Sequence, residues 1–432
     1  MTVGARRLHV SGDLRVLGDK SISHRALLLA ALASGHSTVR GVLQSADIQS
    51  SAAVLRALGA SLSRLAAITT IEGRGLRGLT PAAAALDCGN SGTTARLLLG
   101  ILAAQPFSAT LTGDASLSRR PMRRVAEPLR AMGAVIDTPQ SHDGLPLTIS
   151  GGALRPLNWT TPVASAQIKS AILFAGLCGG VPVTIAEPQR SRDHTERMLS
   201  SLGVDLRVAH AGAPNQVTLQ PVERLPPFDT SIPGDPSSAA YIAALAAMAD
   251  GGEITIRNVL LNPTRTGFIT VMRRMGARID TESQEAFGES LGDLTARSGT
   301  TLVATSIEPD EIPTLIDEIP LLACVAARAD GVTTIRGAAE LRVKESDRIA
   351  AIVQNLRLLG IQCEELPDGL RVTGAPGAPL RGRVQTFGDH RIAMAFATLG
   401  AVSGGQIEVD DPACVEISYP AFWRDVAHVT RG

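Results

Sequence analysis

The chain has 432 residues, with 41 Lys and Arg residues balanced by 41 Asp and Glu residues. Apolar residues make up 44% of it and aromatic residues only 3%. The charge balance and the scarcity of rings argue against a general nucleic-acid binder, which needs a basic surface and stacking platforms. The apolar content excludes a largely disordered chain, and the length predicts two or three domains.

One local pattern recurs along the chain. A polar or charged cluster begins an Ala- and Leu-rich helix of about four turns, Gly or Pro ends the helix, and a strand rich in Val, Ile and Thr follows. The predicted helices are 21–33, 92–104, 167–178, 237–249, 318–329 and 391–402. Because they are apolar nearly all round, we expect them to be buried inside their modules.

A second helix follows in each of the first five modules and ends in Gly, which favours the left-handed conformation just past a helix end. These glycines are Gly59, Gly133, Gly203, Gly276 and Gly360. The sixth module keeps only a candidate second helix, 421–427. The period of roughly 70 to 80 residues is longer than that of a usual solenoid repeat, so each module is expected to be a small α/β unit.

Six modules suggest two lobes of three modules each, with crossovers near residues 18–19 and 231–235. The module that begins at Ser237 needs strands, and the segments 7–10 and 15–17 could supply them. The chain would then leave one lobe, build the other and return. This organisation predicts a discontinuous lobe of residues 1–17 and 234–432 and an inserted lobe of residues 18–233.

The sequence predicts a cytoplasmic protein with no membrane span. Its first residues lack the apolar region of a signal peptide, and no apolar run reaches about 18 residues. The cysteines are isolated, without a CxxC pair, so we expect reduced structural thiols and no zinc site. They are Cys88, Cys178, Cys324, Cys363 and Cys414.

The predicted helix starts carry the informative chemistry. Unpaired N–H groups and the helix dipole favour anions there, and several starts also carry Lys or Arg. For any single start, solvated capping residues remain an alternative. If the helices of each lobe run parallel, their starts converge, and two facing lobes would form a cationic cleft for a ligand with phosphate and carboxylate groups. Asp317 and Glu345 are candidate acid–base groups within it.

At these residues the sequence resembles the 5-enolpyruvylshikimate-3-phosphate (EPSP) synthases, the 3-phosphoshikimate 1-carboxyvinyltransferases. The resemblance covers essentially the whole chain. Its motifs are DKSISHRALLLAALA, CGNSGTTARLLLG, SRRP, ASAQIKSA, SRDHTE, LRVKESDR and FGDHRIAMAFA. It implies the enolpyruvyl transferase fold, an α/β architecture with two domains of three βαβαββ repeats each, arranged as inside-out α/β barrels.

The resemblance also implies a reaction. The enolpyruvyl group of phosphoenolpyruvate would pass to the 5-hydroxyl of shikimate 3-phosphate through a tetrahedral intermediate, with release of inorganic phosphate, in the shikimate pathway to aromatic amino acids. It implies a monomer that needs no cofactor and no metal, with its active site in the interdomain cleft.

Site residues are carried over motif by motif. Matches to shikimate 3-phosphate contacts are Lys20, Ser21, Arg25, Ser165, Ala166, Gln167, Arg192, Asp317 and Lys344. Matches to phosphoenolpyruvate contacts are Lys20, Gly92, Arg120, Gln167, Glu345, Arg348, His390 and Arg391. Asp317 matches the base for the 5-hydroxyl proton and Glu345 the acid for the methylene carbon. Lys20 is a further catalytic candidate, and which of these residues carries each proton stays open.

The sequence departs from many family members at Glu340, where they have Asn, at Ala166, where they have Ser, and at Ile417, where they have Lys. One cation on the phosphoenolpyruvate side is therefore missing or supplied elsewhere. The ASAQ, SRDHTE and ELRVKESDR motifs resemble the class II branch. Gly92 is Ala in glyphosate-insensitive class II members, so we expect glyphosate to compete with phosphoenolpyruvate here.

Two alternatives remain. The sister family of UDP-N-acetylglucosamine enolpyruvyl transferases shares the six-repeat fold, but its catalytic loop carries a Cys shortly before an Arg-Pro pair, and the segment 113–121 has none. A non-catalytic repeat protein with an anion-binding cleft would bind ligand without turnover.

Overall fold

The computed structural model describes residues 8–139, 143–209, 215–402 and 406–430. The chain forms two compact units. The discontinuous unit comprises Met1–Leu17, Pro233–Glu285 and Ser290–Gly432, and the inserted unit comprises Gly18–Ile232 and Ala286–Glu289. Compared with the ranges expected from the sequence, Pro233 groups with the discontinuous unit and Ala286–Glu289 with the inserted one.

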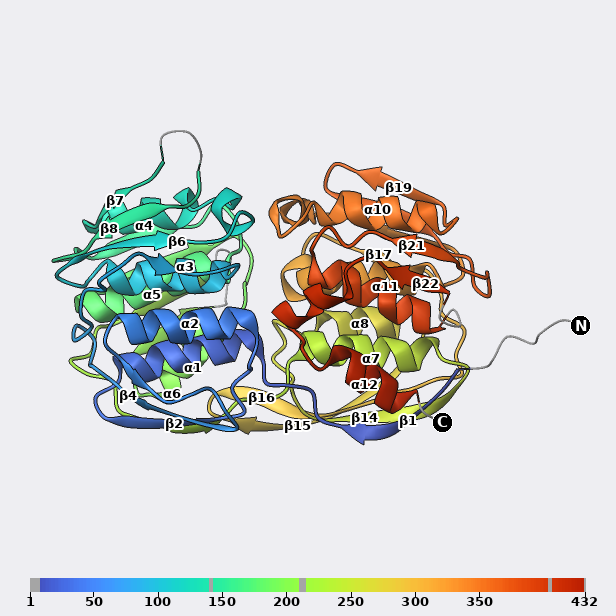
Figure 1. The fold of residues 1–432 in the computed structure, drawn as a ribbon, viewed down its shortest axis with the longest axis horizontal. Coiled ribbons are helices and arrows are strands. Elements are labelled where there is room, and N and C mark those ends of the chain that lie inside the picture. Colours follow the sequence, from blue (N-terminus) through green and yellow to red (C-terminus); the bar gives the residue numbers. More distant parts are fainter. Residues whose placement is uncertain (1–7, 140–142, 210–214, 403–405, 431–432) are drawn as a thin grey trace, which may run out of the picture. The chain divides into compact units, whose positions relative to one another are not determined.

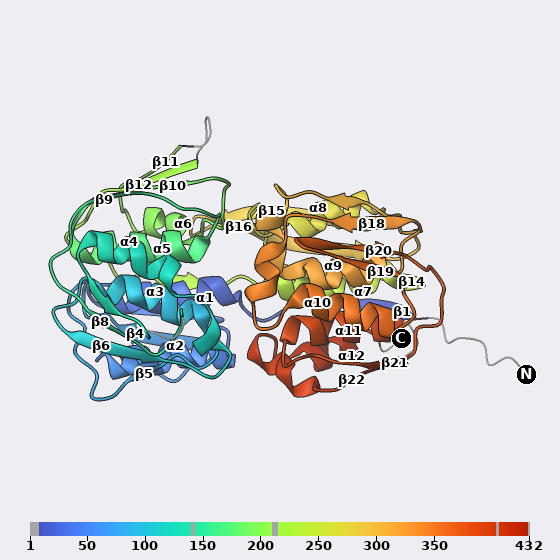
Figure 2. The ribbon, with the colours of Figure 1, turned by 90° about the horizontal axis from the view of Figure 1, so that it is seen from above.

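The inserted unit consists of sheets that surround helices (Figures 1 and 2). Its helices in the described ranges are α1 (Lys20–Leu32), α2 (Ala46–Ala57), α3 (Gly92–Leu102), α4 (Arg123–Met132), α5 (Ala166–Gly179) and α6 (His194–Ser201), with a 3-10 turn η1 (Leu117–Arg119). Its strands there are β2 (His36–Arg40), β3 (Ser61–Leu62), β4 (Ile68–Glu72), β5 (Leu86–Asp87), β6 (Ser108–Thr112), β7 (Val135–Asp137), β8 (Leu147–Ser150), β9 (Leu157–Thr160), β10 (Val183–Glu187), β11 (Leu206–Ala209), β12 (Asn215–Leu219) and β13 (Asp229–Ser231). They form the sheets β13-β2-β4-β3, β5-β6-β8-β7 and β9-β10-β12-β11.

The discontinuous unit repeats this plan. Its helices in the described part of the chain are α7 (Pro236–Met248), α8 (Gly267–Arg274), α9 (Ile319–Ala326), α10 (Arg348–Leu358), α11 (His390–Val402) and α12 (Phe422–Val429), with 3-10 turns η2 (Ile312–Thr314), η3 (Ile316–Glu318), η4 (Ala339–Val343) and η5 (Pro412–Ile417). Its strands there are β1 (His9–Leu14), β14 (Gly251–Leu260), β15 (Arg278–Ala286), β16 (Glu289–Arg297), β17 (Ser306–Ile307), β18 (Val332–Ile335), β19 (Cys363–Leu366), β20 (Gly369–Thr373), β21 (Gly382–Val384) and β22 (Ile407–Val409). The sheets are β1-β14-β16-β15, β17-β18-β20-β19 and the pair β21-β22.

The predicted α/β modules are confirmed. Each predicted apolar helix is present to within a few residues, and each of the four-stranded sheets has one parallel edge pair followed by antiparallel pairs. The fifth apolar helix begins one residue later than predicted, at Ile319, and ends three residues earlier, at Ala326. A 3-10 turn at Ile316–Glu318 precedes it, and Pro320 occupies its first turn, where a missing N–H costs least. The sixth module is smaller, with the strand pair β21-β22 in the described ranges.

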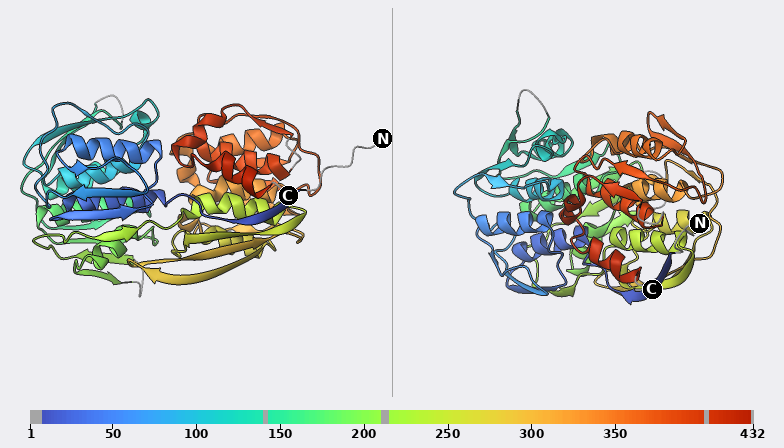
Figure 3. Two further views of the ribbon diagram at one scale, coloured as in Figure 1. Left: turned by 60° about the horizontal axis from the view of Figure 1, so that its bottom comes forward. Right: turned by 45° about the vertical axis from the view of Figure 1, so that its right-hand side comes forward.

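At each crossover, a strand next to the crossover pairs with a strand from a distant part of the chain in the same unit. The N-terminal strand β1 pairs in parallel with β14, with Val10 opposite Gly252, and Figure 3 shows the blue N-terminal strand beside yellow-green β14. It is one strand over His9–Leu14 rather than the two expected segments 7–10 and 15–17, and Arg7 lies outside the described residues. The returning segment supplies β13, which pairs in parallel with β2. Each unit is thus completed by a distant part of the chain.

The inner helices are buried as predicted. Residues 22–32 of α1, 94–102 of α3 and 168–178 of α5 are buried in the inserted unit, and all of α9 is buried in the discontinuous unit. Gly100 permits α3 and α5 to approach closely, because a Cβ there would lie 2.1 Å from the carbonyl oxygen of Ala171. In the described residues, no helix has both the length and the apolar character needed to cross a membrane.

A chain of buried polar side chains joins the inner helices of the inserted unit. His24 Nδ1 lies 2.8 Å from Ser51 Oγ, which lies 2.7 Å from Thr94 Oγ1, and Thr94 donates to Ser91 Oγ over 2.7 Å. Burial lowers the pKa of His24 well below its usual 6.5, and the nearby charges of Lys20 and Arg25 lower it further. His24 is therefore neutral at pH 7.

This neutral histidine predicts a pH-dependent stability. Below about pH 6.5 the unfolded chain binds a proton at His24 that the folded chain does not. As the pH is lowered, this residue therefore reduces the free energy of unfolding by at most about 1.4 kcal/mol per pH unit. The melting temperature of the wild type should drop more between pH 7.5 and pH 5.5 than that of His24→Asn. Equal drops in the two proteins would contradict this assignment.

Candidate active site

The starts of the inner helices lie together in the inserted unit. Arg96 on α3 donates from Nη1 to Gln167 Oε1 over 2.7 Å, and Gln167 on α5 donates from Nε2 to Thr93 Oγ1 over 3.0 Å. Ala166 and Gln167 are partly exposed whereas the following turns of α5 are buried. These contacts bring the starts of α3 and α5 together, as predicted, and the start of α5 is partly exposed.

The start of α1 carries two predicted site cations, Lys20 and Arg25, which differ in burial and in their partners. Lys20 is partly exposed and forms an ion pair with Asp47, while the neighbouring Ser21 is partly exposed. Arg25 is buried and donates from Nε to Thr195 Oγ1 over 2.7 Å and from Nη2 to Ser170 Oγ over 2.9 Å. Burial lowers the pKa of Arg25 to about 10, which still leaves the guanidinium charged at neutral pH.

Guanidinium groups flank the start of α3. A Cβ on Gly92 would lie 3.0 Å from Arg96 Nη1 and 3.4 Å from Arg120 Nη1. Arg120 is held by Asn90, to whose Oδ1 it donates over 2.8 Å. Two charged guanidinium groups beside a helix start make an anion-binding arrangement. Arg96 is not among the predicted site residues, although its position one turn after Gly92 places it on the same helix face.

Ser165 and Arg192 lie on segments that meet at a buried carboxylate. The backbone N–H of Ser165, just before α5, donates to Glu187 Oε1 over 3.3 Å. The hydroxyl of Ser191 donates to the same oxygen over 2.6 Å. Arg192 follows Ser191 directly and is partly exposed.

In the discontinuous unit, the predicted site residues gather around Arg348 at the start of α10. Its guanidinium donates to Glu345 Oε2 over 2.5 Å, to Asp317 Oδ1 over 3.4 Å and to Asp389 Oδ2 over 2.8 Å. Burial favours the neutral form of this group, but Asp389 and Glu345 outweigh it and raise the pKa of Arg348 above its usual value. The two predicted acid–base residues, Asp317 and Glu345, therefore share one charged guanidinium.

Asp389 connects this group to the start of α11. It is fully buried and accepts the backbone N–H of Arg391 over 2.9 Å and the hydroxyl of Ser346 over 3.0 Å. Asp389 belongs to the FGDHRIAMAFA motif but is not among the predicted site residues. His390, also buried, begins α11, so the predicted His390 and Arg391 lie beside the Arg348 group.

Glu318 brings the starts of the inner helices together in this unit too. Its Oε1 accepts a hydrogen bond from Ser237 on α7 and lies 3.9 Å from Arg391 Nη1 on α11. Burial favours a neutral Arg391, but Tyr241, Asp317 and Glu318 together raise its pKa well above the usual value.

Two of the positions at which the sequence departs from many family members, Glu340 and Ile417, have identifiable contacts in the structure. Lys344 Nζ lies 3.7 Å from Glu340 Oε1, so the unusual glutamate pairs with a predicted substrate-binding lysine. Ile417, where many relatives carry Lys, is partly buried and packs against the hydrophobic core of its unit. It offers no charge to a ligand.

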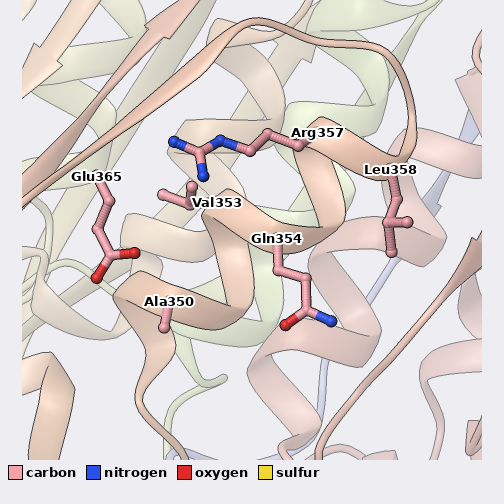
Figure 4. A pocket seen from close by; sticks show the side chains of 6 residues that line it. All are labelled: Ala350, Val353, Gln354, Arg357, Leu358 and Glu365. Carbon is pink, nitrogen blue, oxygen red and sulfur yellow. The ribbon is translucent and has the colours of Figure 1, made fainter.

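Other features lie apart from these groups. A pocket of about 500 Å³ beside α10 is lined by Ala350, Val353, Gln354, Arg357, Leu358 and Glu365, none of which is a predicted site residue (Figure 4). Within the described ranges, His, Cys, Asp and Glu side chains form no group of three or more that could hold a metal ion. The cysteines are free and buried, and burial raises the pKa of the Cys88 and Cys178 thiols to about 12.

Comparisons with known proteins identify the family of the chain. The family model for EPSP synthase (3-phosphoshikimate 1-carboxyvinyltransferase) matches residues 5–426. The 3-phosphoshikimate 1-carboxyvinyltransferase of Aquifex aeolicus is 47% identical over 421 residues, which cover 97% of each chain. The solved EPSP synthase of Acinetobacter baumannii has a TM-score of 0.86 at 38% identity, covering 98% of this chain and 97% of that one.

A more distant structure supports the fold alone. The enolpyruvyl transferase NikO from Streptomyces tendae has a TM-score of 0.73 at 18% identity, covering 99% of this chain and 96% of its own. From the family match and the close relatives together, the chain belongs to the EPSP synthase family and is a transferase of the 3-phosphoshikimate 1-carboxyvinyltransferase type.

Proposed function

We propose that the chain transfers the enolpyruvyl group of phosphoenolpyruvate to the 5-hydroxyl of shikimate 3-phosphate and releases inorganic phosphate. The observation that carries the residue assignment is the shared guanidinium of Arg348, which holds Asp317 and Glu345. The reaction needs one group that accepts a proton and one that donates a proton. Asp317 as a carboxylate and Glu345 as a carboxylic acid would fill these roles, and both lie in one unit.

The proposed chemistry is addition followed by elimination. In the addition, Asp317 takes the 5-hydroxyl proton as the oxygen bonds to C2 of phosphoenolpyruvate, and Glu345 gives a proton to C3. In the elimination, the bond from C2 to the phosphate oxygen breaks, Glu345 recovers a proton from C3, and the departing phosphate takes the proton held by Asp317. Each carboxyl group thus returns to its starting state.

The cationic helix starts bind the anionic groups. We assign Lys20, Ser21, Arg25, Ser165, Ala166, Gln167, Arg192 and Lys344, with Asp317, to shikimate 3-phosphate. We assign Lys20, Gly92, Arg120, Gln167, Arg348, His390 and Arg391, with Glu345, to phosphoenolpyruvate, and we add Arg96. Both sets act on one pair of substrates, and holding the two reactants in line could lower the barrier by roughly 7–11 kcal/mol.

We also propose that the enzyme works as a monomer in the cytoplasm and that glyphosate competes with phosphoenolpyruvate. The steric argument for glyphosate is the absence of a side chain at Gly92. A methyl group there would come to 3.0 Å from Arg96 Nη1 and narrow the space between the flanking guanidinium groups. Glyphosate is longer than phosphoenolpyruvate, so a methyl group at position 92 would lower the affinity for glyphosate more than the affinity for phosphoenolpyruvate.

Phosphate release tests the proposed function. Purified protein should release phosphate from phosphoenolpyruvate with shikimate 3-phosphate and not with UDP-N-acetylglucosamine. Asp317→Asn and Glu345→Gln should each lower kcat by at least about 100-fold, because general acid–base groups contribute that much or more. Glu365→Gln, a change at an exposed carboxylate, should leave kcat unchanged. Binding of both substrates without phosphate release would favour the non-catalytic alternative, and near-wild-type kcat in either site variant would remove that residue from its role.

Glyphosate inhibition tests the role of Gly92. Gly92→Ala should raise the inhibition constant of glyphosate by roughly 10- to 200-fold, the usual effect of one methyl group in a close-fitting site. The KM for phosphoenolpyruvate, measured in the same variant, should change less. An inhibition constant unaffected by the substitution would argue against this steric account.

A further inference from the structure

The inserted unit contains a group of buried charges that the proposed reaction does not use. Lys169 Nζ lies 2.7 Å from Glu187 Oε2 and 2.7 Å from Glu196 Oε1. Lys169 and Glu187 are each only 1% exposed and Glu196 is 4% exposed. Buried ion pairs contribute little net stability, since the desolvation of each charge offsets much of their attraction. Stability of the fold alone is therefore a weak reason for this group.

The Lys169 ammonium is charged despite its burial. Burial alone would lower the pKa of Lys169, but Glu196 and Glu187 together raise it above its usual value. Burial raises the pKa of Glu196, against the pull of Lys169. The ammonium thus holds Oε2 of Glu187 in place, and Oε1 of the same carboxylate accepts hydrogen bonds from neighbouring segments.

Glu187 ties two separate segments to the end of β10. Its Oε1 accepts the backbone N–H of Ser165 over 3.3 Å and the hydroxyl of Ser191 over 2.6 Å. Its Oε2 accepts the backbone N–H of Ser191 over 3.5 Å in addition to the Lys169 contact. One segment begins α5 and the other precedes α6.

Both segments carry residues assigned above to shikimate 3-phosphate. The first is 165–167 and the second includes Arg192. We propose that Glu187 is a positioning residue for shikimate 3-phosphate, because its carboxylate sets the spacing between these two phosphate-binding segments. This rests on the proposed function. On the phosphoenolpyruvate side, Arg120 is held by Asn90. The shared residue Gln167 is held there by Arg96 and Thr93 rather than by Glu187.

The test is Glu187→Gln, which keeps the size of the side chain and removes its charge. The dissociation constant and the KM of shikimate 3-phosphate should rise at least about tenfold, the scale expected when hydrogen bonds to a charged group are weakened. The KM of phosphoenolpyruvate should stay within about twofold, and kcat at saturation within about threefold, because the reacting groups are untouched. Calorimetric binding of shikimate, which lacks the 3-phosphate, should be unchanged, because the effect acts through the phosphate.

Glu196→Gln is the matched control. Glu196 is also buried and paired with Lys169, but it lies on α6 rather than between the two segments. Its substitution should raise the KM of shikimate 3-phosphate less than Glu187→Gln does, because Glu187 rather than Glu196 accepts the hydrogen bonds from Ser165 and Ser191. If Glu187→Gln does not fold, Ser191→Ala removes one of the contacts more gently and should still weaken shikimate 3-phosphate binding about threefold or more.

The outcomes are distinct. A wild-type enzyme that turns over, with shikimate 3-phosphate affinity unchanged in Glu187→Gln, would overturn the positioning role alone. Equal weakening of shikimate, shikimate 3-phosphate and phosphoenolpyruvate would also overturn it, since that pattern indicates a general structural role. A wild-type protein that releases no phosphate would overturn the proposed function itself, whatever Glu187→Gln does to binding.

Discussion

The discontinuous unit depends on one buried guanidinium. Arg348 is 1% exposed, and a charge at that depth is tolerated only when it is paired and hydrogen-bonded. The partners come from separate elements: Asp317 from the turn before α9, Glu345 from the loop before α10, and Asp389 from the start of α11. Satisfying one charge therefore fixes the relative positions of the elements that carry the proposed proton-transfer groups. Removing a partner from a buried pair typically costs about 3–5 kcal/mol, so these positions are strongly constrained.

In the inserted unit, several separate hydrogen bonds, rather than one buried charge, fix the relative positions of the helix starts. Its inner helices are almost wholly apolar, and the polar contacts among them gather near their first turns: Arg96 with Gln167, Arg25 with Ser170, and Glu187 with Ser165. Buried apolar turns make these helices rigid supports, while their starts stay partly open to a ligand. A rigid helix whose free N–H groups face an anion is well suited to bind phosphate without rearranging.

Much of this organisation was predictable from local sequence. Apolar runs ended by Gly or Pro gave the inner helices to within a few residues, because burial and helix termination are local signals. The roles of Arg96, Asp389 and Glu187 were not predicted, because each depends on a side-chain contact between segments that are not local in sequence. The partners are 71 residues apart for Arg96 with Gln167, 41 for Arg348 with Asp389 and 22 for Glu187 with Ser165. The pairing of β1 with β14 depends on the return of the chain to its first unit, which periodicity indicates only in outline.

The most direct test of the central claim is kcat of Arg348→Lys at saturating phosphoenolpyruvate and shikimate 3-phosphate, with folding checked by circular dichroism. A lysine keeps the positive charge but lacks the planar fork that engages Asp317, Glu345 and Asp389 together. We predict that kcat falls at least about 100-fold, whereas Arg357→Lys, at an exposed position on the same helix, leaves it unchanged. A folded Arg348→Lys enzyme with wild-type kcat would contradict the claim that this guanidinium organises the acid–base groups.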